Sequence, residues 1–154
     1  MIGISESQLM QWLLPLLWPM LRTLALISSA PVLSMRTIPA RVKVGLAFLV
    51  ALSAQASLPV MPIVPLDGAQ GLAMVAQQVL IGVTLGFAAR VVFAALEFAG
   101  ELIGLQMGLN FAGFFDPTSG TQGTATARFF GTIGSLLFVV ENGHLLLVMA
   151  VVKS

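Results

Sequence analysis

Hydrophobic and polar positions divide this chain into four apolar runs, and each run predicts a helix. The runs cover residues 8–34, 40–58, 69–109 and 124–152. A bilayer core about 30 Å thick takes about 20 residues of helix to cross, which is close to the length of the shortest run. The pattern therefore predicts an all-α membrane protein with long hydrophobic helices, some of them broken.

Prolines interrupt the first run and close the second. The stretch Trp12–Pro19 contains two prolines, which predict a bent helix or a short break, because proline removes a backbone donor and clashes with the preceding turn. The prolines within residues 59–65 rule out a continuing helix there. Asp67 and Gly68 follow as a predicted turn and helix N-cap.

Basic residues cluster in one connection between the apolar runs. Arg36, Arg41 and Lys43 lie within residues 34–43 and are three of the seven basic residues. By the positive-inside rule this connection is predicted to be cytoplasmic, whereas the proline-rich connection, which has no Lys or Arg, is predicted on the outer side. Pro39 is expected to open the following helix.

The third run is about twice as long as one crossing needs, and its glycines recur every four residues. Gly82 and Gly86 form one such pair, and Gly100, Gly104 and Gly108 repeat the spacing. Small residues at this spacing let helix backbones approach closely. These glycines therefore predict helix packing.

The stretch Gly100–Gln122 begins as a helix and then loses its periodicity in a tract of Phe, Gly, Asp, Pro, Thr and Ser. In an apolar environment such a loop is tolerated only where protein covers it or where it lines a polar cavity, because lipid cannot satisfy its free backbone groups. This stretch is the first indication of a pore.

Three ionisable residues of the third run, Arg90, Glu97 and Glu101, are spaced by seven and four positions and so project from one helical face. Ionisable groups at membrane depth are costly unless each finds a partner or water. The face predicts either an ion pair or interface network with neighbouring subunits, or a polar conduit or proton relay. Acid–base catalysis is disfavoured because no nucleophile or metal cluster accompanies the two carboxylates.

Candidate metal ligands and reactive groups are sparse. Glu141 and His144 have the spacing of two metal ligands on a helix, but there is no second histidine, so a polar bend at Asn142 and Gly143, or helix packing, is favoured. The absence of cysteine excludes disulfides and thiol catalysis. A composition of 58% hydrophobic and 8% charged residues with a net charge of +1 indicates an integral membrane protein without a nucleic-acid footprint, and no cofactor is expected.

Two stretches of the sequence carry a family resemblance. One is GELIGLQMGLNFAGFFDPTSG, from Gly100, which is followed later by ARFF and by NGHLLL. The other is PVLSMRTIPARVKVGLAF, at Pro31–Phe48. Together they resemble the FliR family of flagellar type III export apparatus proteins, and the likeness covers essentially the whole chain. The amino-acid sequence of the central loop favours the flagellar members over their injectisome relatives.

The resemblance implies a subunit of the flagellar type III protein export gate, which conducts rod, hook and filament proteins. Its expected place is the bacterial inner membrane, as a multi-pass protein of the flagellar basal body, with its helices in hairpins that pack into a ring. The implied partners are FliP-like and FliQ-like subunits, FlhB-like and FlhA-like components, membrane lipid and exported unfolded polypeptides, but no nucleic acid. No enzymatic activity is expected.

In such gates a central loop protrudes into the channel as a plug, which the resemblance places at residues 107–122. The residues expected to form the plug are Met107, Asn110, Phe111, Phe114, Phe115, Asp116, Pro117 and Gln122. Residues 1–154 are expected to form a single helical export-gate domain. Family members continue past the equivalent of Ser154 with further helices, so the resemblance implies that this chain is their N-terminal part.

Other functions stay open from the residues alone. A small multi-pass membrane transporter would also place broken helices and buried charges around a substrate, and an injectisome export-gate subunit shares the architecture. An intramembrane enzyme is the weakest alternative, because the sequence has no HExxH, no GxSxG and no intramembrane Asp pair.

Overall fold

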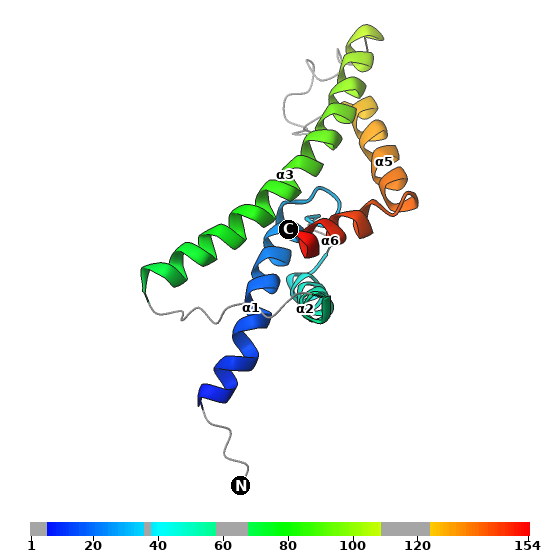
Figure 1. Cartoon of the computed structure of the whole chain (residues 1–154). Coiled ribbons are helices and arrows are strands. Elements are labelled where there is room, and N and C mark those ends of the chain that lie inside the picture. Colours follow the sequence, from blue (N-terminus) through cyan, green and yellow to red (C-terminus); the bar gives the residue numbers. More distant parts are fainter. Residues whose placement is uncertain (1–5, 36–37, 58–67, 109–123) are drawn as a thin grey trace. The chain divides into compact units, whose positions relative to one another are not determined.

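The computed structural model describes residues 6–35, 38–57, 68–108 and 124–154, and every regular element in these residues is a helix (Figure 1). The helices are α1 (Glu6–Ser29), α2 (Ala40–Ser57), α3 (Ala69–Gln106), α5 (Ala125–Val140) and α6 (Gly143–Lys153). The prediction of an all-α chain is confirmed for this part of the sequence. The arrangement into hairpins around a ring stays a prediction.

The helices fall into two compact units, and the single export-gate domain expected for residues 1–154 stays a prediction. The first unit comprises Met1–Phe87 and Leu145–Ser154, and the second comprises Ala88–His144. Helix α3 contributes its N-terminal half to the first unit and its C-terminal half to the second.

In the first unit, α1 and α2 pack together along small side chains. The buried residues of α2 are Ala47, Val50, Ala51 and Ala54, whose spacing of three and four places them on one face. Alanines at such positions let two helix backbones come close. The large apolar residues of α2, such as Leu49, point elsewhere and remain exposed.

Helix α1 runs without a break through Pro15 and Pro19. Of the two alternatives predicted near Trp12–Pro19, the short break is therefore wrong and the bent helix stays a prediction. Each proline removes only one backbone hydrogen bond, and the other bonds of the same turns hold the helix together. The helix ends at Ser29, before the predicted limit at residue 34. Pro31 explains the earlier end, because it has no N–H to continue the ladder.

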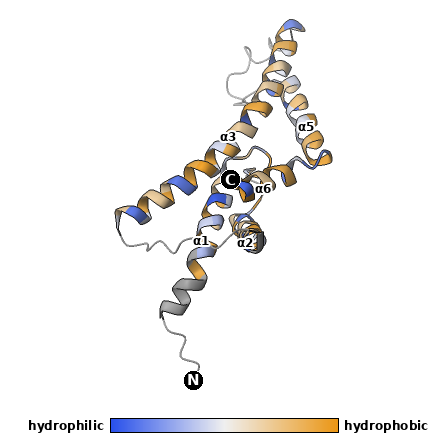
Figure 2. Cartoon of the chain, viewed as in Figure 1, coloured by the Kyte–Doolittle hydropathy of each residue, from blue (hydrophilic) through white to orange (hydrophobic). Residues whose placement is uncertain are grey.

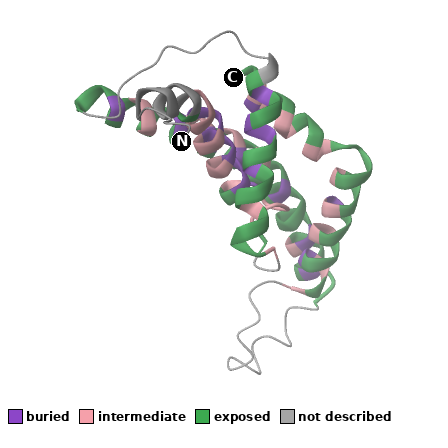
Figure 3. Cartoon of the chain, turned by 90° about the horizontal axis from the view of Figure 1, so that it is seen from below, coloured by how far each residue is buried: buried purple, intermediate pink, exposed green. Residues whose placement is uncertain are grey.

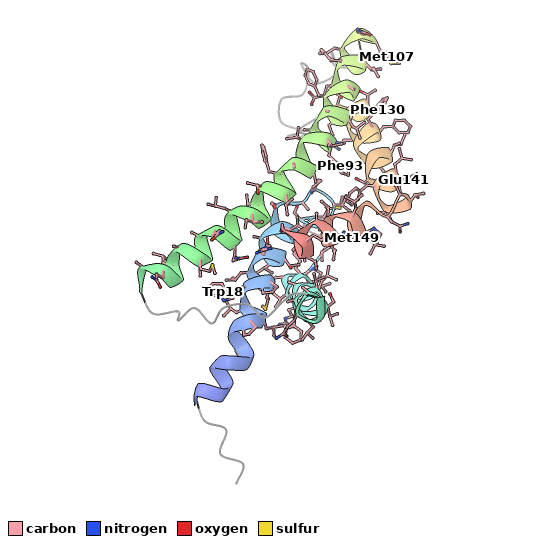
Figure 4. All side chains as sticks on the ribbon, in the orientation of Figure 1. Trp18, Phe93, Met107, Phe130, Glu141 and Met149 are labelled. Atoms are coloured by element: carbon pink, nitrogen blue, oxygen red, sulfur yellow. The ribbon has the colours of Figure 1, made fainter. Side chains whose placement is uncertain are left out.

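In the second unit, the C-terminal half of α3 packs against α5. The ring of Phe93 on α3, labelled in Figure 4, meets the ring of Phe138 on α5 edge to face. The ring centroids are 5.5 Å apart. This geometry is the favourable one for two aromatic quadrupoles. Gly134 of α5 lies next to the ring of Phe93, because a Cβ built there would lie 3.9 Å from Cδ1 of Phe93. The same Cβ would lie 2.8 Å from Cδ1 of Leu96.

The last predicted run, residues 124–152, is divided into α5 and α6. Asn142 has a φ of 55°, in the left-handed region that asparagine tolerates better than most residues. A Cβ on the next residue, Gly143, would collide with the ring of Phe138. The predicted bend at Asn142 and Gly143 is confirmed, and its cause is local backbone geometry rather than proline.

Helix α5 begins with an N-cap. The hydroxyl of Thr124 accepts a hydrogen bond from the N–H of Ala127 at 3.1 Å, and its backbone is extended with φ −71° and ψ 158°. Such a bond satisfies one of the free donors in the first turn of a helix.

Removing this cap gives a local prediction. Thr124→Ala is expected to destabilise the second unit by about 1 kcal/mol, whereas Thr124→Ser keeps an acceptor and should cost little. Protease protection of α5 in detergent-solubilised protein measures the difference. Equal protection of the alanine and serine variants would contradict the cap.

Most of the surface of these helices is exposed and apolar (Figures 2 and 3). Leu72 on α3 is 73% exposed and Val140 on α5 is 72% exposed. Among the described residues, α3 is long and apolar enough to cross a membrane, and α5 with α6 passes the same test as one bent pair. Only 17% of the most apolar 18-residue segment of α3 is buried. Such a surface needs lipid or other protein around it.

Candidate functional site

Helix α3 buries a single narrow stripe of residues. Of its 38 residues, the buried ones are Gly71, Gln78, Gly82, Gly86, Phe93, Gly100 and Gly104. They follow one another at intervals of seven and four, so they share one face of the helix. Five of the seven are glycines, which means that neighbouring segments approach the backbone of α3 itself.

Gly82 and Gly86 lie against α1 within the first unit. A Cβ on Gly82 would collide with the carbonyl oxygen of Arg22 and lie 2.7 Å from the Cβ of Ala25. A Cβ on Gly86 would collide with the hydroxyl of Ser29 and lie 3.0 Å from the backbone nitrogen of Ala30. Two successive turns of α3 therefore touch two successive turns of α1.

Gly100 has the same role in the second unit. A Cβ there would lie 2.8 Å from the Cα of Ala127 and 2.9 Å from the carbonyl oxygen of Thr126, both in the first turn of α5. Gly104 is buried as well. The spacing of the glycines in the sequence marked this face but not the helix against which it packs.

Gly108 differs from the other glycines and corrects the prediction made for it. It lies beyond the end of α3 with a φ of +71°, and a Cβ built on it would meet none of the described atoms within 4 Å. Its N–H donates to the carbonyl oxygen of Leu105 at 3.1 Å. A glycine in the left-handed region just past the last turn ends a helix rather than packing it.

A buried polar cluster lies in the first unit around Arg22, whose side chain is 7% exposed. Its Nε donates to Oε1 of Gln78 at 2.7 Å. Its Nη1 donates to the carbonyl oxygen of Val151 at 3.4 Å and to the hydroxyl of Ser154 at 3.2 Å. One side chain of α1 thus joins α3 and the C-terminal end of α6.

Sequence analysis missed this cluster. Arg22 stands in an apolar run with no acidic residue anywhere from Ser7 to Leu66. A lone cation in such a run was the available signal, because it must find acceptors within the protein. Gln78 supplies one, although it lies 56 positions away in the sequence.

The ionisable face predicted from Arg90, Glu97 and Glu101 is present on α3. Arg90 and Glu97 are exposed, Glu101 is half-buried, and the described residues provide none of them with an ion pair. The side chain of Glu97 lies over Gly131 of α5, whose Cβ position is 3.2 Å from Oε1. An interface network with neighbouring subunits and a polar conduit therefore both stay predictions.

Glu141 and His144 have the spacing of metal ligands, although the sequence analysis favoured a bend or helix packing for them. Among the described residues, no group of three or more His, Asp or Glu side chains could hold a metal ion. Glu141 is exposed, and Nδ1 of His144 is buried without a hydrogen-bond partner.

A family model described as bacterial export proteins, family 1, matches residues 13–154. The chain belongs to this family. The resemblance stated from its motifs is therefore confirmed at the level of the family.

Two curated relatives of this family 1 export protein align with the whole chain. It is 45% identical over 154 residues to the flagellar biosynthetic protein FliR of Escherichia coli, and 44% identical over 154 residues to that of Pectobacterium carotovorum. A relative of the same name from Bacillus subtilis is 30% identical over 127 residues, which is 82% of this chain and 49% of the relative. The chain spans 59% of the length of the first two relatives.

Most of the plug predicted for this family 1 export protein, Asn110 to Gln122, lies outside the described residues. Met107 is described, directly after α3, and its side chain is 64% exposed (Figure 4). Sequence analysis also did not single out Gly131 and Gly134 of α5. Their spacing of three was the signal that α5 presents a face of small residues to a neighbour.

Proposed function

We propose that this chain is a subunit of the flagellar type III protein export gate in the bacterial inner membrane. The observation that carries the proposal is the family match over residues 13–154, with relatives named flagellar biosynthetic protein FliR at 45% and 44% identity. In this role the chain helps to form the protein-conducting channel for rod, hook and filament proteins in the flagellar basal body.

The surface of the helices supports a role in assembly. Exposed large apolar side chains run along α2, α3 and α5, while α3 buries only a narrow glycine-rich stripe. Arg90 and Glu97 are exposed on an otherwise apolar helix, where contact with lipid would be costly. These features favour FliP-like and FliQ-like subunits around the chain, with FlhB-like and FlhA-like components nearby and lipid at the periphery.

The length of α3 fits a multi-pass protein whose helices are not all simple spans. Its 38 residues extend about 57 Å at 1.5 Å per residue, which exceeds a hydrocarbon core of about 30 Å. The helix is therefore tilted or projects out of the membrane. The proposed plug, residues 107–122, follows its C-terminal end and closes the channel between rounds of export.

Co-purification tests the assembly proposal. The tagged chain, expressed together with the FliP-like and FliQ-like subunits of the same bacterium, is expected to be recovered in a stable complex with both. Expressed alone, it is expected to aggregate, because its polar residues in apolar helices lack a protein face.

The rival function is a small-solute transporter. A monodisperse, folded chain that binds neither subunit but binds a small solute would overturn the export-gate assignment. Native mass determination on the same preparation separates the complex from a monomer.

A further inference from the structure

Arg22 is a buried cation with only neutral partners. Its Nε and Nη1 bind the Gln78 side chain, the carbonyl of Val151 and the hydroxyl of Ser154. None of these groups carries a negative charge. A buried guanidinium without a counter-charge costs several kcal/mol relative to water, and neutral hydrogen bonds offset only a part of that cost.

The first unit has no described carboxylate side chain to supply the missing charge. It holds five of the seven basic residues and two of the six acidic ones, which are Glu6 and Asp67. Asp67 lies outside the described residues. Glu6 begins α1, sixteen positions before Arg22 and thus about 24 Å away along the helix. The terminal carboxylate of Ser154, whose hydroxyl Arg22 contacts, makes no ion pair with Arg22 either. Among the described residues of this unit the charge of Arg22 is therefore uncompensated.

The guanidinium keeps one free edge. Nη2 has no hydrogen-bond partner among the described residues. It is also not among their fully enclosed unpaired polar atoms, which are Trp18 Nε1 and His144 Nδ1. Since Arg22 as a whole is 7% exposed, this edge is accessible over a small area only.

Trp18 gives a second, independent sign of a missing acceptor. Trp18, labelled in Figure 4, lies one turn before Arg22 on the same face of α1 and is 1% exposed. Its indole N–H finds no hydrogen-bond partner among the residues that the structure describes. Buried indole N–H groups normally find an acceptor. This turn of α1 thus has more donors than acceptors.

We propose that Arg22 is a receptor for a carboxylate: an Asp or Glu side chain of another subunit binds the Nη2 edge when the chain assembles. This inference rests on the proposed function, since it requires partner subunits. A guanidinium edge matches the geometry of a carboxylate, and the small exposed area of Arg22 favours one side chain over a phospholipid headgroup.

Gln78→Glu tests the proposal without removing Arg22. It places a carboxylate against Nε, where Gln78 Oε1 now accepts at 2.7 Å, and so neutralises the cation from within. Recovery of FliP-like and FliQ-like subunits with this variant is expected to fall about tenfold or more, as when one member of a buried charge pair is lost. Gln77→Glu is the matched control, because it adds the same charge one position away on another face of α3. Its own loss measures the general cost of a carboxylate on this helix, and the loss with Gln78→Glu is expected to exceed it about tenfold.

Three results would overturn the receptor role. They are parent-like recovery with Gln78→Glu, an equal loss with Gln77→Glu, and a loss of protease resistance in Gln78→Glu that the control does not share. Arg22 would then only join helices within this chain. If the parent chain itself recovers no partner, the proposed function fails instead. Exchanging each membrane-depth Asp or Glu of the co-expressed subunits for Asn or Gln should reveal one whose effect is not additive with Gln78→Glu. Additivity at every such position would also refute the proposal.

Discussion

A chain carrying Gly82→Ala and Gly86→Ala is expected to lose the packing of α3 against α1 and with it the ability to assemble. At Gly82 the new Cβ would collide with the carbonyl of Arg22, and at Gly86 it would lie 3.0 Å from the nitrogen of Ala30. Backbone atoms cannot rotate away as flexible side-chain ends can. Overpacking of this kind costs about 1–3 kcal/mol at each site, which exceeds the roughly 0.5–1 kcal/mol that alanine gains over glycine in a helix.

Gly45→Ala isolates the effect of the collision. Gly45 lies within α2, and a Cβ there would meet nothing within 4 Å, so the variant gains helix propensity without a clash. It is expected to be neutral or slightly stabilising. The comparison is made on the yield of protease-resistant complex with the co-expressed subunits. If the double variant matched Gly45→Ala in this yield, the close approach of α3 to α1 would be refuted.

These glycines also show which part of the helix packing can be predicted from the sequence. A spacing of four identifies the face on which Gly82, Gly86, Gly100 and Gly104 lie, because an α-helix repeats every 3.6 residues. The spacing does not identify the neighbour, which is α1 for Gly82 and α5 for Gly100. Gly108 continues the same spacing but lies past the helix end, since periodicity does not distinguish a packed glycine from one with positive φ.

The partners of Arg22 could not be predicted from the sequence for a different reason. A cation in an apolar run predicts that acceptors exist, but two of those it uses lie on Gln78 and Val151, at sequence separations of 56 and 129. No local pattern connects positions so far apart. The unbroken course of α1 through Pro15 and Pro19 has another cause: each proline removes only one backbone hydrogen bond, and the other bonds of the same turns hold the helix together.

The proposed plug has its physical basis in the sequence of residues 107–122. Asp116 and Pro117 favour a turn, because the Asp side chain can hydrogen-bond the nearby backbone and proline fixes φ. The apolar residues Met107, Phe111 and Phe114 can then pack together against a ring of partner side chains. Thioether and aromatic groups suit a seal that parts around different unfolded polypeptides and closes again.

Deleting residues 111–120 is therefore expected to make membranes that carry the complete complex leak ions in the resting state. The closed state is expected to depend on apolar contact more than on salt bridges, so Phe114→Ala with Phe115→Ala should leak less than the deletion, because the rest of the loop still fills the channel. Ion conductance across membranes with equal amounts of assembled complex gives the readout, and Gly45→Ala provides an assembly-competent control outside the loop. A deletion that assembles normally yet conducts no more than the parent would show that the loop only connects two helices.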